Sequence, residues 1–226
     1  MRSGERRYAA LFDLDGVVID GRVATLAALR ALAQTWSTST VEETVLSQCA
    51  AMPPVQALEK LGVPDAREVY YGHFDAALSA AVSEGVLVFE AVVAAMSALA
   101  AHGAGIGIVT AQARSRIEFW IPPAVADLTD VLVAYEDAVP KPAPDGVLAA
   151  CARLAVPPDR AFFLGDSPTD IAAGRAAGVF TVGAGWGFTG PDALREAGAD
   201  LVLTSPDEVG GRRPGGGEPG GGGGGG

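Results

Sequence analysis

Six polar side chains follow apolar runs in this sequence, and their types suit one kind of chemistry. They are two aspartates after the first run, a threonine after the second, a lysine after the third and two aspartates after the fourth: Asp13, Asp15, Thr110, Lys141, Asp166 and Asp170. Carboxylates without His or Cys favour a hard divalent ion such as Mg²⁺, which binds phosphate oxygens. A lysine and a hydroxyl can hold the same phosphoryl group. The set therefore predicts magnesium-dependent phosphoryl chemistry.

The spacing of the first pair carries separate information. In an extended strand alternate residues project to the same side, so we expect Asp13 and Asp15 to face one bound phosphate. Gly16 then lets the chain turn away. Taken alone, such a pair is more often a solvated turn, and the other four side chains shift the balance toward chemistry.

The elements that must position these residues are visible as apolar runs separated by segments with helical spacing. We expect strands at 8–15, 105–110, 130–136, 160–166 and 179–185, with an edge strand at 200–205. Continuous apolar strands alternating with helices predict an α/β fold with a mainly parallel sheet covered on both faces. Ligands of such sheets bind beyond the carboxyl ends of the strands, where the six polar residues stand.

One interval interrupts this alternation. Residues 16–85 contain helix-like segments and no strand-like run, and they are too many for a loop. We predict a small helical domain inserted there, with residues 1–15 and 86–209 forming the core. Residues 210–226 are rich in Gly and Pro, which predicts a disordered tail.

Composition excludes several classes of partner. The formal net charge of −11 disfavours nucleic acid and anionic membrane surfaces. Cys49 and Cys151 are too few and too far apart for a disulfide framework or a zinc site. The N-terminus lacks the apolar segment of a signal peptide, and no apolar stretch is a convincing membrane span. We expect a cytoplasmic protein, monomeric or homodimeric.

The motifs DLDGVV (13–18), VT (109–110), KPAPD (141–145) and GDSPTD (165–170) occur in that order on four expected strands. In this the chain resembles the haloacid dehalogenase superfamily, in its phosphoglycolate-phosphatase-like branch with a helical cap. The segment AGRAAGVFTVGAGWG (173–187) is similar as well, and the resemblance covers roughly residues 8–209. It implies a three-layer Rossmann-like core whose cap, residues 16–85, is inserted after the first strand.

The resemblance also implies roles. Asp13 would be the nucleophile that forms an aspartyl-phosphate, and Asp15 the general acid and then base. Thr110, Ala111 and Lys141 would hold the phosphoryl oxygens. The ligands of Mg²⁺ would be the Asp13 carboxylate, the Asp15 backbone carbonyl and Asp166, assisted by Asp170.

The chain departs from the branch at several points. Gly21 stands where a serine is usual, Phe89 and Glu90 replace a common Pro-Gly pair, and AQARSR follows Thr110. Other polar residues stay unassigned to a role in substrate binding: Asp20, which suits a hinge or a helix cap, His73, Arg114 and Arg116. For the three tryptophans, Trp36, Trp120 and Trp186, packing is the simplest interpretation.

The sequence thus predicts a phosphatase acting on a small phosphorylated metabolite. A phosphoglucomutase-like phosphotransferase would use the same site, and a receiver-like signalling module or a catalytically silent binding protein are alternatives of other classes. The Ala- and Arg-rich, Lys-poor composition is typical of GC-rich bacterial genomes. A substrate from natural-product biosynthesis, such as a phosphorylated aminoshikimate-type precursor, is one hypothesis.

Overall fold

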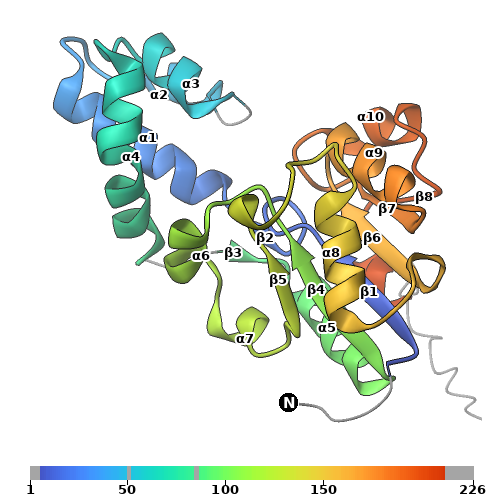
Figure 1. Ribbon diagram of the computed structural model, residues 1–226. Helices are drawn as coiled ribbons and strands as arrows, with labels where there is room; N and C mark the ends of the chain where they lie inside the picture. The colour runs from blue at the N-terminus through green and yellow to red at the C-terminus, as the bar shows by residue number, and fades with distance from the viewer. Residues whose placement is uncertain (1–5, 50–51, 84–86, 212–226) are drawn as a thin grey trace, which may run out of the picture.

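The protein is built around a six-stranded parallel sheet. The computed structural model describes residues 6–49, 52–83 and 87–211. The strands are β1 (Tyr8–Phe12), β4 (Ala104–Val109), β5 (Val131–Val133), β6 (Ala161–Gly165), β7 (Phe180–Ala184) and β8 (Leu201–Leu203). Their order is β5-β4-β1-β6-β7-β8, and every pairing is parallel (Figure 1). The expected α/β fold is confirmed, with β1 between β4 and β6.

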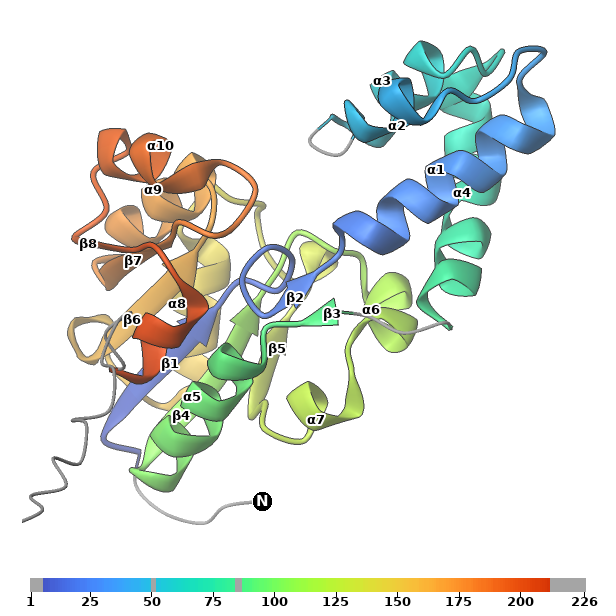
Figure 2. The same cartoon turned by 180° about the vertical axis from the view of Figure 1, so that it is seen from behind.

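Helices cover both faces of this sheet, as the continuous apolar strands require. On one face lie α8 (Asp145–Leu154), α9 (Pro168–Ala177) and α10 (Gly190–Glu196), and on the other α5 (Glu90–Ala101) with the 3₁₀ turn η3 (Pro206–Gly210) (Figures 1 and 2). Alternate residues of β1 serve the two layers, since Leu11 packs in one buried cluster and Phe12 in the other.

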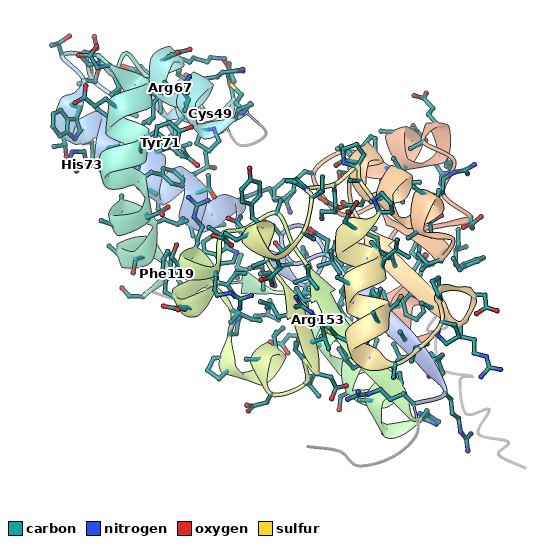
Figure 3. The ribbon with its side chains drawn as sticks, viewed as in Figure 1. Cys49, Arg67, Tyr71, His73, Phe119 and Arg153 are labelled. Carbon is teal, nitrogen blue, oxygen red and sulfur yellow. The ribbon has the colours of Figure 1, made fainter. Side chains whose placement is uncertain are left out.

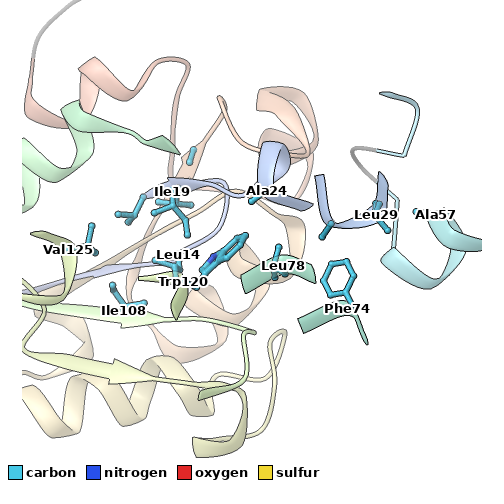
Figure 4. Packing of buried hydrophobic residues seen from close by; sticks show 14 of the residues in the cluster. Leu14, Ile19, Ala24, Leu29, Ala57, Phe74, Leu78, Ile108, Trp120 and Val125 are labelled. Carbon is cyan, nitrogen blue, oxygen red and sulfur yellow. The ribbon is translucent and has the colours of Figure 1, made fainter. Parts of the chain in front are cut away.

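A second group of helices stands off one side of the sheet (Figure 2). It comprises α1 (Arg22–Trp36), α2 (Glu43–Ser47), α3 (Pro54–Lys60) and α4 (Ala66–Val82), and α1 packs along α4. The short antiparallel pair β2 (Ile19–Asp20) and β3 (Leu87–Val88) lies where the chain enters and leaves this group. The apolar packing of the helical group continues into the core through Leu78, Trp120 and Leu14 (Figure 4).

Three expectations about strands were wrong in detail. β1 ends at Phe12 rather than at residue 15, and β5 ends at Val133, followed by the 3₁₀ turn η1 (Tyr135–Asp137). The interval 16–85, expected to lack strands, contains β2, whose two residues pair with a strand about 68 positions away. So short a pair leaves no local periodicity. The remaining elements are α6 (Arg114–Trp120), α7 (Pro123–Ala126) and the 3₁₀ turn η2 (Pro158–Arg160).

The division into a core of 1–15 and 86–209 and a cap of 16–85 stays a prediction. Its second boundary and most of the expected tail, residues 212–226, lie outside the described residues. Within the described part of the chain, no helix combines the length and apolar character that crossing a membrane requires.

Candidate active site

The ends of adjacent strands bring the predicted site residues together. Asp13, Thr110 and Asp166 directly follow β1, β4 and β6, the three neighbouring strands at the centre of the sheet. The chain is held at these points by backbone hydrogen bonds from Asp13 to the Leu164 carbonyl (2.8 Å) and from Thr110 to the Val133 carbonyl (3.0 Å). All three side chains are buried although they are polar, so each needs a partner.

Lys141 is the partner of two of the acids. Its Nζ lies 2.6 Å from Asp13 Oδ1 and 2.5 Å from Asp170 Oδ1, and it also donates to the Val109 carbonyl at 3.3 Å. The ammonium is itself largely buried. Burial alone would lower the pKa of Lys141, but the carboxylates of Asp13 and Asp170 outweigh it and the pKa is raised. The lysine is therefore a fixed positive charge beside Asp13.

Asp170 is oriented by the first turn of α9. Ser167 is the N-cap and forms a capping box with Asp170. Asp170 Oδ2 accepts hydrogen bonds from Ser167 Oγ (2.6 Å) and from the backbone NH groups of Ser167 (3.0 Å) and Asp166 (3.2 Å). Its other oxygen, Oδ1, faces Lys141. The cap thus fixes which oxygen points into the site.

Asp166 is enclosed by the backbone of two loops. Its Oδ2 accepts a hydrogen bond of 2.7 Å from the Phe188 NH, and a Cβ at Gly16 or Gly187 would overlap this carboxylate. Gly16 also has a positive φ of 79°, which a residue with a side chain rarely adopts. Both glycines are needed for the close approach.

The donor set of this cluster fits a divalent cation. Single oxygens of Asp13, Asp166 and Asp170 all lie within 4.8 Å of one another. Mg²⁺ binds oxygen ligands at about 2.1 Å, so one ion can bridge oxygens this far apart with little movement. With one lysine against three carboxylates, the buried cluster has two formal negative charges in excess. This imbalance is what a dication would neutralise.

The same imbalance appears in the pKa values. Burial, with the neighbouring Asp170 and Asp166, raises the pKa of Asp13 well above its ordinary range despite Lys141. Burial likewise raises the pKa of Asp166 to about 7, against the opposing hydrogen bond from Phe188. The cluster therefore retains a proton at neutral pH unless a cation compensates it.

Asp15 has different partners. Its Oδ2 accepts a hydrogen bond of 2.5 Å from Gln112 Nε2, and its Oδ1 accepts one of 3.0 Å from Trp120 Nε1. Burial raises the pKa of Asp15 to about 6, although both hydrogen bonds oppose the rise. β1 ends at Phe12, so the strand alternation expected to orient Asp15 does not reach this residue. The indole and the amide orient its side chain instead.

Gly21 explains how the indole reaches Asp15. A Cβ on this residue would lie 2.5 Å from both Trp120 Cζ2 and Asp15 Oδ1. The buried Trp120 ring thus occupies the space that a side chain at position 21 would need. The departure from serine at this position accompanies a tryptophan that contacts the candidate acid.

The phosphoryl-binding candidates meet beside Lys141. Thr110, Ala111 and Lys141 line a small hollow of about 20 Å³. Thr110 Oγ1 accepts a hydrogen bond of 3.1 Å from the Gln112 NH, which fixes the loop that carries Gln112. The three residues are thus adjacent, and their role in holding a phosphoryl group stays a prediction.

The unassigned polar residues fall into two groups. Asp20 belongs to β2 and also accepts from the Arg22 NH (3.1 Å), so it stands both at the junction and at the start of α1. Arg116 reaches Gln112 Oε1 at 2.9 Å, close to Asp15. Arg114 instead pairs with Asp137, and His73 lies on the outer side of α4 against Trp36 (Figure 3). The last two lie outside the acidic site.

Sequence reasoning missed Gln112, Trp120, and the backbone of Phe188. Gln112 lies in the AQARSR segment that departs from the branch. The only sequence signal for a role of Trp120 is the combination of this residue with Gly21. Asp15, the partner of Gln112 and Trp120, is 97 and 105 positions away from them, respectively. No single local pattern identifies them.

Comparisons with known proteins agree with this geometry. Residues 10–184 match the family model of haloacid dehalogenase-like hydrolases. A phosphoglycolate phosphatase from Salmonella paratyphi A is 27% identical over 179 residues, covering 78% of this chain and 69% of that protein. One from Shigella dysenteriae serotype 1 is 25% identical over 228 residues, covering 88% and 89%.

Solved structures show the same fold. A haloacid dehalogenase superfamily hydrolase of subfamily IA from Geobacter sulfurreducens has a TM-score of 0.70 at 20% identity, covering 92% of this chain and 98% of that one. A β-phosphoglucomutase from Clostridium difficile has a TM-score of 0.63 at 18% identity, covering 89% and 92%. These likenesses concern the fold, and the family match over residues 10–184 shows that the chain is an enzyme of the haloacid dehalogenase-like hydrolase family.

Proposed function

We propose that the protein is a Mg²⁺-dependent phosphatase that hydrolyses a small phosphorylated metabolite through an aspartyl-phosphate on Asp13. The observation that carries the proposal is that two neighbouring acids have different partners. Asp13 sits in the cluster with Lys141, Asp166 and Asp170, while Asp15 is held by Gln112 and Trp120. A phosphoryl-transfer enzyme of this kind needs one acid as nucleophile and another as proton donor.

In the first half of the reaction, the Asp13 carboxylate attacks phosphorus and the bond from phosphorus to the substrate oxygen breaks. Asp15 gives its proton to that leaving oxygen, and a pKa near 6 suits this task at neutral pH. In the second half, Asp15 takes a proton from the water that attacks the phosphorus of the aspartyl-phosphate. Asp13 is then restored and inorganic phosphate leaves.

Lys141, Thr110 and the Ala111 NH hold the phosphoryl oxygens through these steps. The residues that would hold Mg²⁺ are Asp13, the backbone carbonyl of Asp15, and Asp166, with Asp170 behind them. When bound, the ion supplies positive charge between these carboxylates and the phosphoryl group. We assign helices α1–α4 the role of a cap over this site.

The test is release of inorganic phosphate from p-nitrophenyl phosphate. We expect Mg²⁺-dependent turnover that EDTA abolishes, and Asp13→Asn should lower kcat by about a thousandfold or more. Asp192→Asn, on the exposed face of α10, is the control with the same charge change and should keep normal turnover. Near-normal turnover of Asp13→Asn would disprove the nucleophile assignment.

A phosphotransferase is the second candidate, because phosphoglucomutase-type proteins share the fold. The same site would then return the phosphoryl group to a sugar hydroxyl instead of to water. Incubation with glucose 1-phosphate separates the two activities. Appearance of glucose 6-phosphate in place of free phosphate would favour the transferase. The match to a hydrolase family argues against the receiver-like module.

A further inference from the structure

One cavity connects Asp15 with the helical group. It has a volume of about 300 Å³ and lies between α1, α4, residues 52–54, α6 and the loop before α10. A cavity of this size has room for a compact, ring-sized ligand. A larger hollow, of about 590 Å³, lies among Glu59, Glu68 and Tyr71, and none of the candidate catalytic aspartates lines it. The chemistry of the walls around Asp15 therefore indicates which leaving group the site accepts.

Much of the cavity wall is apolar. Seven side chains supply this surface: those of residues 52–54 and those of Phe74, Leu78, Trp120 and Phe188. Figure 4 shows Phe74, Leu78 and Trp120 in succession, with Trp120 nearest to the core residue Leu14. Apolar and aromatic walls stabilise a ligand with an apolar face, since contact removes both surfaces from water.

The two cations described in the wall are already paired. Arg22 donates to both oxygens of Asp20, from Nε at 2.7 Å and from Nη2 at 2.5 Å. Arg116 donates to Asp75 from Nε at 3.0 Å and from Nη2 at 2.5 Å. A carboxylate on the ligand would meet guanidinium groups whose charge these acids already compensate, and it would also face the acidic Asp15.

We propose that the cavity selects phosphate esters of uncharged, ring-sized alcohols that have an apolar face, and that it discriminates against esters of small hydroxy acids such as 2-phosphoglycolate. The proposal rests on the phosphatase function above and names its substrate class. Discrimination comes from the paired arginines, and attraction comes from the aromatic wall.

The first test compares kcat/KM for cyclohexylmethyl phosphate, glucose 6-phosphate and 2-phosphoglycolate. The better of the two ring esters should exceed 2-phosphoglycolate by about tenfold or more, as expected when apolar contacts of a few methylenes are gained. A smaller ratio overturns the proposal while leaving the phosphatase function intact. If p-nitrophenyl phosphate is not hydrolysed either, both proposals are overturned.

A second test frees one arginine. Asp75→Asn removes the acid paired with Arg116 and leaves an uncompensated guanidinium at the wall. Its kcat/KM for 2-phosphoglycolate should rise by about threefold relative to the preferred ring ester, a change suited to a partly exposed pair. Asp192→Asn, which removes the acid paired with Arg195 on α10, is the matched control and should leave the ratio unchanged. An unchanged ratio in Asp75→Asn overturns the charge argument.

A third test addresses the apolar wall with two similarly exposed phenylalanines. Phe188→Ser should lower kcat/KM for the ring ester about tenfold more than for 2-phosphoglycolate. Phe180→Ser, at the start of β7, changes a comparable exposed ring away from Asp15 and should leave the ratio as it is. Equal effects of Phe188→Ser on both substrates would contradict the proposal.

Discussion

The two catalytic candidates of the first motif are kept apart by their partners. Asp13 pairs with a lysine in a cluster of carboxylates, and Asp15 accepts hydrogen bonds from neutral donors. A neutral donor steadies a carboxylate without adding a charge that would drive its pKa far down. Burial therefore prevails, and the pKa of Asp15 rises to about 6. A proton donor for a leaving oxygen requires this combination of fixed direction and raised pKa.

Trp120→Phe tests the indole as a positioning residue. The ring volume is largely kept, while the NH donor to Asp15 Oδ1 is lost. A hydrogen bond to a charged group contributes about 1.5–3 kcal/mol, so kcat should fall by about tenfold or more. In an Asp15→Asn background the same change should have little further effect, because the two residues act together.

Trp36→Phe is the matched control. Trp36 lies on α1, is 43% exposed and packs against His73, away from Asp15. It should keep normal kcat. Additive effects of Trp120→Phe and Asp15→Asn would show that the indole does not act through Asp15.

How far the sequence predicts the site follows from where each residue stands in the chain. Asp13, Thr110 and Asp166 could be assembled in advance, because the carboxyl ends of adjacent parallel strands meet at one edge. The positions of Gln112 and Trp120 could not be predicted, because these residues lie in a loop and a helix whose orientation the sequence does not specify. The sequence also indicated the wrong cause for the direction of Asp15, because the strand stops three residues before it.

At the scale of elements, long regular strands were predictable and short pairings were not. Runs such as AGIGIV (104–109) are apolar throughout, and burial on both faces explains why. β2 and β3 have two residues each, and they pair only because the helical group between them brings its ends together. Their register is thus set by the fold rather than by local composition.

The junction at Gly21 yields a prediction for the start of α1. Gly21→Ala places a methyl group against Trp120 and Asp15, so we expect a loss of about 1–3 kcal/mol in the free energy of unfolding and a lower kcat. Denaturant unfolding and phosphate release measure the two effects. Gly72→Ala, inside α4, meets no atom within 4 Å and should instead add about 0.5–1 kcal/mol through helix propensity.

The critical outcome is the sign of the change in the free energy of unfolding for each of these two variants. A stabilising Gly21→Ala would mean that the indole can move without cost and does not hold Asp15 in place. A destabilising Gly72→Ala would show that glycine-to-alanine changes are unfavourable in this protein for other reasons.

For the whole molecule, the arrangement of charge matters more than its total. The chain has a net charge of −11, and part of this excess is concentrated at the buried edge of the sheet rather than spread over the surface. Folding must therefore remove several carboxylates from water beside one lysine. This unfavourable desolvation is compensated when the carboxylates bind a ligand, which links the stability of the whole fold to the site.

This link has a defined pH dependence. Asp13, Asp15 and Asp166 have pKa values raised above those of the unfolded chain, to about 6 for Asp15 and about 7 for Asp166. The metal-free folded state consequently binds more protons than the unfolded state above about pH 4. Stability should then fall as pH rises from about 4 to 7. The lowered pKa values of Asp20, Asp137 and Asp200 act in the opposite sense, but below this window.

Mg²⁺ should reverse the trend, because it binds the deprotonated carboxylates and replaces their protons. We expect the Tm in EDTA to decrease between about pH 5 and pH 8, and millimolar Mg²⁺ to raise the Tm more at pH 8 than at pH 5. Thermal unfolding followed by circular dichroism measures both. Asp166→Asn removes one of the titrating groups and one of the proposed metal ligands, so it should flatten the pH dependence and shrink the Mg²⁺ effect together. A Tm that rises with pH in EDTA would contradict the raised pKa values of the acidic cluster. A Mg²⁺-induced shift in Tm that Asp166→Asn leaves intact would show that the ion does not bind at this cluster.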